Sequence, residues 1–224
     1  LESARAAGFE NLSGDIMMAL PNYSRDEFDE TLNLIAESGA VHISAYLLKI
    51  EAGTPFGLHP PSGLPTEDEA ADFYLYAVDQ LEKAGFAQYE ISNFARPGYE
   101  GRHNLIYWNC EDYLGLGPAA HSCIQNRRFY YANRLSDFMH GQCTLKEEGV
   151  CDVSDYIMLQ LRLRSGLNLK KLNELYGVVF SPRQMKFIEQ CVRAGYAALQ
   201  GDVLTLTPAG LIIQNSILCE LLEE

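Results

Sequence analysis

Apolar positions in the first fifty residues follow a strand, helix, strand order. Residues 11–20 end in an unbroken apolar run that stops at a proline, which is typical of a buried strand. Residues 24–39 carry apolar side chains three or four positions apart, between a serine cap and a closing glycine, and therefore predict a helix. Residues 41–50 are almost continuously apolar, as in a strand buried on both faces. This order predicts a βαβ unit with parallel strands.

A second helix and a third strand follow the same alternation. The loop at residues 51–65 contains four prolines and three glycines, and a loop of this length in a compact domain tends to be functional. Residues 66–85 predict a capped helix that ends at a glycine, and residues 88–94 predict a short strand that ends in polar side chains. The segment 102–108 predicts another short helix.

The pattern changes near residues 141–152, after a glycine-rich turn at 113–122, a strand at 127–133 and a short helix at 135–141. The remaining chain predicts helices, then a hairpin around Gln200-Gly201-Asp202, then a last helix that begins at a proline. Helices followed by a hairpin are similar to a winged helix. We therefore predict two domains, residues 1–140 and residues 141–224. The elements expected in the second are helices 153–164, 169–176 and 182–195, hairpin 196–207 and helix 208–224.

Charge changes the interpretation of both domains. The chain has a formal net charge of −13. Residues 1–100 hold 5 lysines and arginines against 17 acids, whereas residues 101–224 hold 12 against 13. The acidic first part argues against nonspecific binding to nucleic acid. The expected recognition helix 182–195 has only three basic residues, so a packing or docking role is favoured over DNA binding.

Cysteine spacing and apolar run length indicate where the protein acts. None of the six cysteines has the close spacing of a zinc knuckle or an iron–sulfur loop. With no secretion signal in view, reduced thiols in the cytoplasm are expected. No apolar run reaches the ~20 residues of a membrane span. The sequence begins without Met and within an expected helix, so we expect a piece of a longer protein.

Two segments of the sequence carry side chains that could bind a ligand or a metal. His103 and Tyr107 are four residues apart, as are Asn104 and Trp108, so a helix places each pair on one face. An imidazole and a phenol can both bind a metal, and an amide beside an indole suits a flat aromatic ligand with a metal at its centre. The alternative is a buried helix start whose polar groups bond to nearby backbone, and spacing leaves both open. Asp15, in the first strand, either binds a ligand hydroxyl or bonds to backbone amides.

Several stretches resemble the HemW family of heme chaperones. This family belongs to the radical S-adenosylmethionine superfamily and is related to oxygen-independent coproporphyrinogen III oxidase. The H-N-x-x-Y-W element at 103–108 is the specific one and resembles the chaperone branch. The other stretches are Gly14–Pro21, His42–Ser44, Ile50–Phe56, Gln88–Gly98 and Tyr113–Pro118.

The resemblance implies an α/β fold, the C-terminal part of a partial (βα)6 radical S-adenosylmethionine barrel followed by a mostly helical, winged-helix-like domain. It implies that Asp15 holds the ribose hydroxyls of S-adenosylmethionine and that Tyr46 and Leu48 line its adenine. It also implies a heme site, with His103 as the candidate iron ligand. The residues of that site are His103, Asn104, Tyr107 and Trp108.

The sequence departs from the family pattern in three places. The C-x-x-x-C-x-x-C loop that binds a 4Fe-4S cluster is absent, so this chain alone is not expected to cleave S-adenosylmethionine to a radical. Ala19 and Ala119 stand where the family has glycine, which adds a methyl group where the backbone made a close approach.

Three functions remain for this sequence. The first is a heme chaperone that delivers heme to respiratory acceptor proteins. The second is an oxidase that decarboxylates the propionates of coproporphyrinogen III, and the third is an inert product with only a folding core. The first implies heme and an acceptor protein as partners, no nucleic acid, contact with a membrane at most peripheral, and a homodimer as one assembly.

Overall fold

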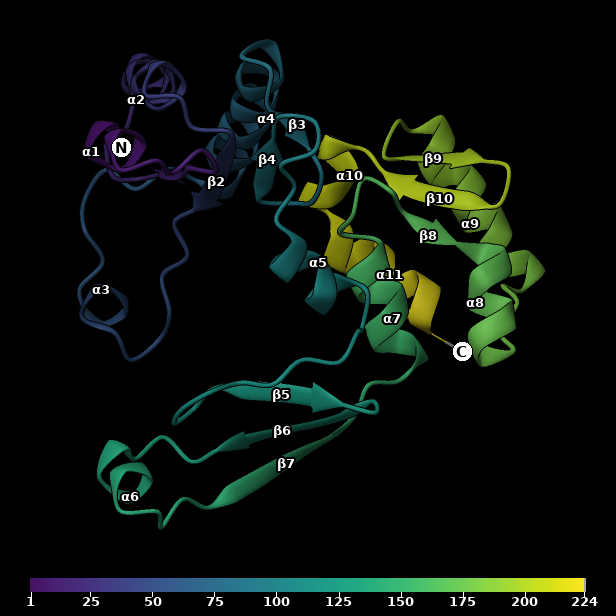
Figure 1. Cartoon of the computed structure of the whole chain (residues 1–224). Helices are drawn as coiled ribbons and strands as arrows, with labels where there is room; N and C mark the ends of the chain where they lie inside the picture. The colour runs from purple at the N-terminus through teal and green to yellow at the C-terminus, as the bar shows by residue number, and fades with distance from the viewer. Residues whose placement is uncertain (224) are drawn as a thin grey trace. The chain divides into compact units, whose positions relative to one another are not determined.

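A computed structural model describes residues 1–223 of the chain. Contacts divide the chain into two compact units, Leu1–Gly101 and a second unit that begins at Arg102 (Figure 1). We describe each unit by itself. The domain border predicted at residues 140 and 141 stays a prediction.

The first unit is a four-stranded sheet with strand order β1-β2-β4-β3. Strands β1 and β2 are parallel, with Ser13 opposite His42 and Met18 opposite Leu47, as the βαβ pattern predicts. The elements of this unit are α1 (Glu2–Ala6), β1 (Ser13–Met18), α2 (Arg25–Glu37), β2 (His42–Leu47), α3 (Pro55–Leu58), α4 (Glu67–Lys83), β3 (Ala87–Gln88) and β4 (Asn93–Ala95).

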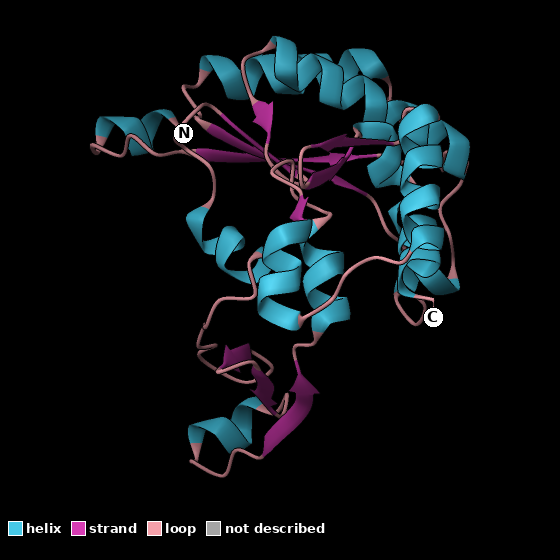
Figure 2. Cartoon of the chain, turned by 90° about the vertical axis from the view of Figure 1, so that its right-hand side faces the viewer, coloured by secondary structure: helices cyan, strands magenta, loops and turns pink. Residues whose placement is uncertain are grey.

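Capping boxes begin the two long helices of this unit. The Ser24 side chain accepts from the Glu27 backbone N–H while the Glu27 carboxylate accepts from the Ser24 backbone, and Thr66 and Glu69 repeat the arrangement. Figure 2 shows long helices along one side of the sheet. Their apolar stripes bury against β1, β2 and β4, as amphipathic helices do.

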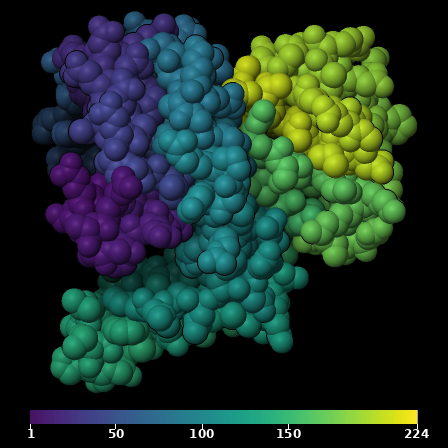
Figure 3. Space-filling view, turned by 45° about the horizontal axis from the view of Figure 1, so that its top comes forward, coloured from purple at the N-terminus to yellow at the C-terminus, as the bar shows by residue number. Residues whose placement is uncertain are grey.

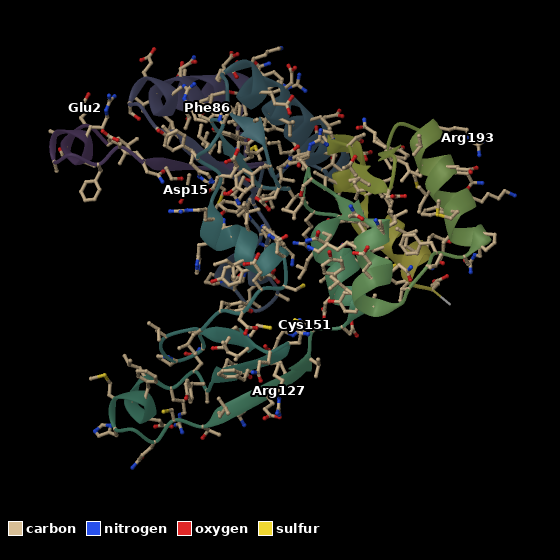
Figure 4. The ribbon with its side chains drawn as sticks, turned by 45° about the vertical axis from the view of Figure 1, so that its right-hand side comes forward. Glu2, Asp15, Phe86, Arg127, Cys151 and Arg193 are labelled. Atoms are coloured by element: carbon tan, nitrogen blue, oxygen red, sulfur yellow. The ribbon has the colours of Figure 1, made fainter. Side chains whose placement is uncertain are left out.

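The two faces of the sheet differ because successive side chains of a strand point to opposite faces. Ile16 and Met18 enter the core under the helices, whereas Asp15 and Met17 are exposed on the other face. Figure 4 shows Asp15 and the buried core residue Phe86 on opposite sides of the sheet. The long helices of this unit therefore pack on the face opposite to Asp15 and Met17.

The single strand predicted at residues 88–94 is wrong. These residues form a hairpin, in which β3 and β4 are antiparallel and β4 is also antiparallel to β2. The turn forms because the buried Glu90 carboxylate accepts from the backbone N–H of Ser92 and the side chain of Asn93. The polar residues taken as a strand end are thus the turn itself.

The second unit contains a winged helix, as predicted. Its small sheet has the order β8-β10-β9, with both pairs antiparallel. In Figure 3 the C-terminal residues, in yellow, continue the surface of the green residues before them. The predicted last helix is divided in two at Ile213. The elements are α7 (Val153–Gln160), β8 (Leu167–Asn168), α8 (Leu169–Tyr176), α9 (Pro182–Arg193), β9 (Ala197–Gln200), β10 (Val203–Leu206), α10 (Pro208–Ile212) and α11 (Gln214–Leu222).

A three-stranded antiparallel sheet precedes the winged helix. The sequence predicts its middle strand and α6 (Leu135–Met139) but neither β5 (His121–Ile124) nor β7 (Leu145–Val150). All six residues of β7 are exposed, so the strand lacks the apolar alternation that marks a buried face. The middle strand is β6 (Arg127–Tyr131).

Helix α5 (Arg102–Trp108) belongs to the second unit and packs on α7. The side-chain amide of Gln160, the last residue of α7, donates to the backbone carbonyl of Trp108 at 2.9 Å. Among the described residues, none of the helices combines the length and the apolar character needed to cross a membrane.

Candidate functional site

The exposed face of the first sheet brings together part of the predicted S-adenosylmethionine site. Asp15 lies opposite Ser44 and Met17 lies opposite Tyr46 in the parallel pair β1 and β2. The side chains of Met17 and Tyr46 are 48% and 42% exposed. The face therefore offers one exposed carboxylate beside apolar and aromatic surface. Such a surface fits an adenosine, whose ribose hydroxyls donate hydrogen bonds and whose base is flat.

Leu48 lies just beyond β2 and is half-buried. Its backbone N–H donates to the carbonyl of Met18 at 2.9 Å, so this group is already used within the sheet. Tyr46 is therefore the residue of this pair that lies within β2, and the placement of Tyr46 and Leu48 beside one adenine stays a prediction.

His42 is a residue of this face that sequence reasoning missed. Its Nδ1 lies 2.8 Å from Ser13 Oγ and its Nε2 lies 2.9 Å from Tyr89 Oη, which also accepts from the Gly101 N–H at 3.1 Å. A neutral imidazole satisfies both contacts with one donor and one acceptor nitrogen. Burial lowers the pKa of His42, and the charge of Asp15 acts in the opposite direction with a smaller effect. The sequence signal that could have identified His42 is its spacing of two and four residues from Ser44 and Tyr46, which places all three on one face of the strand.

A hollow of about 430 Å³ lies beyond the end of β1. Ala19 lines it with φ of +57°, a left-handed backbone that favours glycine. Asn22, Arg25 and Asp72 supply polar groups to the same hollow. The alanine at the family's glycine position is therefore accommodated in the glycine-like conformation.

Helix α5 carries the predicted heme residues, and its faces divide as the spacing predicts. Tyr107 Oη lies 2.6 Å from His103 Nε2, and the two rings meet edge to face with centroids 4.9 Å apart. Both side chains are exposed, Tyr107 by 36%. Tyr113 packs edge-on against Tyr107 at 4.5 Å. An imidazole and a phenol thus reach solvent together as one polar pair.

The other face of α5 is turned toward the protein. Trp108 is half-buried, with the Arg162 guanidinium 5.4 Å from its ring centre, and Asn104 is half-buried on the same face. The indole Nε1 of Trp108 is buried without a hydrogen-bond partner among the described residues. These contacts make Trp108 the anchor of the helix, while His103 and Tyr107 on the neighbouring face are exposed.

His121 has structural partners. Its Nδ1 lies 2.7 Å from the Glu148 carboxylate, and its ring stacks on Tyr130 at 4.8 Å. Side chains of β6 and β7 therefore engage the imidazole of His121 within its own sheet.

The cysteines do not form an iron–sulfur site. All six lie in the second unit, and none of the described residues gather three or more metal-binding His, Cys, Asp or Glu side chains. The sulfur atoms of Cys123 and Cys151 lie 3.8 Å apart, and both cysteines are buried. Figure 4 shows Cys151 at the junction of β7 and α7. The residues present therefore do not fit a 4Fe-4S cluster.

The chain shares its fold with a radical S-adenosylmethionine enzyme of known structure. The coproporphyrinogen III oxidase HemN from Escherichia coli, described as a radical SAM enzyme, superposes with a TM-score of 0.75 at 18% identity, over 97% of this chain and 56% of that chain. Residues 153–213 match the family model described as the HemN C-terminal domain. These matches confirm the predicted α/β fold class.

The chain is a relative of the HemW heme chaperones. It is 31% identical to the heme chaperone HemW of Mycobacterium tuberculosis (strain ATCC 25618 / H37Rv) over 98% of this chain and 57% of the relative. It is 29% identical to HemW of Bacillus subtilis (strain 168) over 96% and 60%, and 30% identical to HemW of Escherichia coli (strain K12) over 96% and 58%. The chain thus spans about three fifths of the length of these curated relatives.

Proposed function

We propose that this chain binds heme at the exposed face of α5, as part of a heme chaperone that passes heme to an acceptor protein. The observation that carries the proposal is the exposed pair of His103 and Tyr107, 2.6 Å apart in a helix whose other face is anchored by Trp108. The names of the relatives support heme as the ligand. The choice of a respiratory protein as acceptor belongs to this proposal.

The geometry of α5 suits a cargo that must leave again. Imidazole and phenolate both serve as axial ligands of heme iron. The ring of Tyr113 beside Tyr107 adds aromatic surface against which a porphyrin can pack. Because both side chains are exposed, a bound heme stays accessible to an acceptor.

We also propose that the exposed face of the first sheet binds S-adenosylmethionine in the full-length protein. Asp15 would accept hydrogen bonds from the ribose hydroxyls, and Tyr46 and Leu48 would flank the adenine. A 4Fe-4S cluster, which in this superfamily supplies the electron for cleavage, has no ligands in this chain. The residues described therefore bind and orient the nucleoside and perform no radical step.

The alternative function is decarboxylation of coproporphyrinogen III. The structural likeness to HemN supports this alternative only at the level of the fold, because HemN is 18% identical to this chain. The H-N-x-x-Y-W element and the chaperone relatives favour heme binding. Incubating the longer protein, with its cluster, a reductant and S-adenosylmethionine, with coproporphyrinogen III separates the two. Formation of protoporphyrinogen would overturn the chaperone assignment.

Titration of the chain with hemin tests the heme proposal. We expect a Soret band that saturates at one hemin per chain and that is lost in the His103→Ala, Tyr107→Phe double variant. A double variant of His140→Ala and Tyr196→Phe is the matched control, because both side chains are exposed and Tyr196 is 37% exposed against 36% for Tyr107. Equal binding by both double variants would refute the α5 site.

Binding of S-adenosylhomocysteine, followed by calorimetry, tests the nucleoside proposal. The Asp15→Asn variant should bind more weakly, since a charged acceptor is replaced by a neutral amide. Asp68→Asn, at an exposed acid in the first turn of α4, is the control and should bind like the unchanged chain. Unchanged binding by Asp15→Asn would remove this residue from the site.

A transfer assay tests the chaperone step, with hemin-loaded chain mixed with a heme-free b-type cytochrome. Heme should appear on the cytochrome faster than free hemin supplies it at the same concentration. Action in the cytoplasm, peripheral contact with a membrane, and homodimer formation belong to the same proposal. Flotation with vesicles and light scattering of the hemin-loaded chain test the last two.

A further inference from the structure

We propose that the atom that binds the heme iron is Tyr107 Oη, and that His103 is the positioning residue that holds this oxygen. This inference rests on the proposed function and departs from the sequence interpretation, in which His103 is the candidate iron ligand. It follows from the way the two side chains already engage each other.

The ring nitrogen of His103 that points away from the helix backbone is not free. Nε2 lies 2.6 Å from Tyr107 Oη, a short contact for a neutral pair. Binding of iron at Nε2 would require this hydrogen bond to break and the Tyr107 hydroxyl to find another partner. Binding of iron at Oη keeps the contact, because a phenolate oxygen accepts from an imidazolium N–H while a lone pair faces the metal.

The pair also fits the chemistry of ferric iron. Hard oxygen anions suit a ferric centre, and Tyr is an established axial ligand of heme. When hemin binds, the O–H bond of Tyr107 breaks, an Fe–O bond forms, and the proton moves to His103 Nε2. The water or chloride on the iron of free hemin leaves, and no electron is transferred. An adjacent base of this kind strengthens a ligand, as hydrogen-bond partners of metal ligands do in other metal sites.

The surroundings fix the phenol for this task. The Tyr113 ring packs edge-on against the Tyr107 ring, with an interplanar angle of 88° and centroids 4.5 Å apart. The Tyr107 ring thus contacts both His103 and Tyr113, while Tyr107 stays exposed on α5.

The ligand choice gives the site a means of release. A phenolate binds ferrous iron less firmly than ferric iron, so reduction weakens the Fe–O bond. A one-electron reductant converts Fe(III) to Fe(II), the Fe–O bond breaks, and the proton returns from Nε2 to Oη. The site would therefore hold oxidised heme and give up reduced heme to an acceptor with stronger nitrogen or sulfur ligands.

Spectroscopy of hemin bound to the whole 224-residue chain tests the inference. The unchanged chain should give a high-spin ferric spectrum with a phenolate-to-iron charge-transfer band and phenolate modes in resonance Raman. Tyr107→Phe should lose both signatures. His103→Ala should keep both signatures while binding weakens by about 10-fold to 100-fold, the usual effect of removing a hydrogen-bond partner from a metal ligand. Dithionite should release heme from the unchanged chain, and Tyr196→Phe is the control.

Each other outcome has one meaning. If His103→Ala removes the wild-type spectrum while Tyr107→Phe keeps it, His103 is the ligand; the inference fails and the proposed function stands. If neither variant changes the spectrum or the affinity, heme does not bind at α5 and the proposed function fails with it.

Discussion

Gln160 donates its side-chain amide to the backbone carbonyl of Trp108 at 2.9 Å, and also to the Asn109 side-chain oxygen at 3.1 Å. Gln160 is only 7% exposed. One buried amide thus joins the end of α7 to the end of α5. The short helix that carries the candidate heme residues depends on this contact for its position.

We expect Gln160→Ala to lower the free energy of unfolding by about 1–3 kcal/mol, because it leaves the Trp108 carbonyl without its partner in a place with little water. Urea unfolding followed by tryptophan fluorescence measures this, since Trp108 is the one tryptophan of the chain. Gln190→Ala, at an exposed position of α9, should stay within about 0.5 kcal/mol of the unchanged chain. Equal effects of both variants would contradict the role given to Gln160.

The His42 network predicts that stability depends on pH. Burial lowers the pKa of His42 from 6.5, so the unfolded chain binds this proton more readily than the folded chain. The contribution is fully present above pH 6.5 and is lost as the pH falls toward the folded pKa. The neighbouring groups that set it are Asp15, Ser13 and Tyr89.

Urea unfolding at about pH 7.5 and about pH 5.5 checks this expectation. The unchanged chain should lose more stability between the two conditions than His42→Gln does. His59→Gln, at an exposed histidine, should behave like the unchanged chain. A slope that is the same with and without His42 would show that its ring is not held neutral by the fold.

Ala119 is expected to carry backbone strain. Its φ is +59°, where an L side chain costs roughly 1–2 kcal/mol. Glycine removes this cost, but its greater entropy in the unfolded chain offsets part of the gain. Ala119→Gly should therefore stabilise the chain, by up to about 1 kcal/mol. Ala120→Gly is the neighbouring control and should destabilise, because φ at Ala120 is not positive. Thermal unfolding of both variants gives the comparison.

The buried thiols are expected to be unreactive. Burial raises the pKa of Cys151 to about 12 and that of Cys110 to about 11, so almost no thiolate is present at neutral pH. Cys219 is exposed. Brief treatment with iodoacetamide, followed by mass spectrometry of peptides, should modify Cys219 long before Cys151. Treatment in guanidinium chloride should remove the difference, and rapid labelling of Cys151 in the folded chain would contradict its burial.

The first unit was predictable in its parallel half. The apolar runs and capping boxes identify β1, α2, β2 and α4 because burial and helix initiation leave local signals at fixed spacings. The hairpin of β3 and β4 was not predictable in this way. Its turn depends on the buried carboxylate of Glu90, and a polar residue in an apolar stretch has the same appearance whether it ends a strand or closes a turn.

The exposed strand β7 shows the opposite difficulty. A strand with six exposed residues leaves no apolar alternation, and only pairing with β6 defines it. The break in the predicted last helix was hidden for a similar reason. The pattern of apolar residues does not change at Ile213, which separates α10 from α11.

The sequence by itself determined the helices and the hairpin of the winged helix, though not its strand β8. It also determined the two pairs on α5, because i and i+4 residues share a helix face whatever surrounds them. It also determined the absence of a C-x-x-x-C-x-x-C loop in these 224 residues. Only the tertiary structure decided which pair is exposed: Trp108 is anchored by Gln160 and Arg162, from segments more than fifty residues away. The same holds for the contacts of His42, since residues from three separate segments must fold together before the ring has partners. Spacing fixes neighbours on one element, and packing between elements decides which of them can meet a ligand.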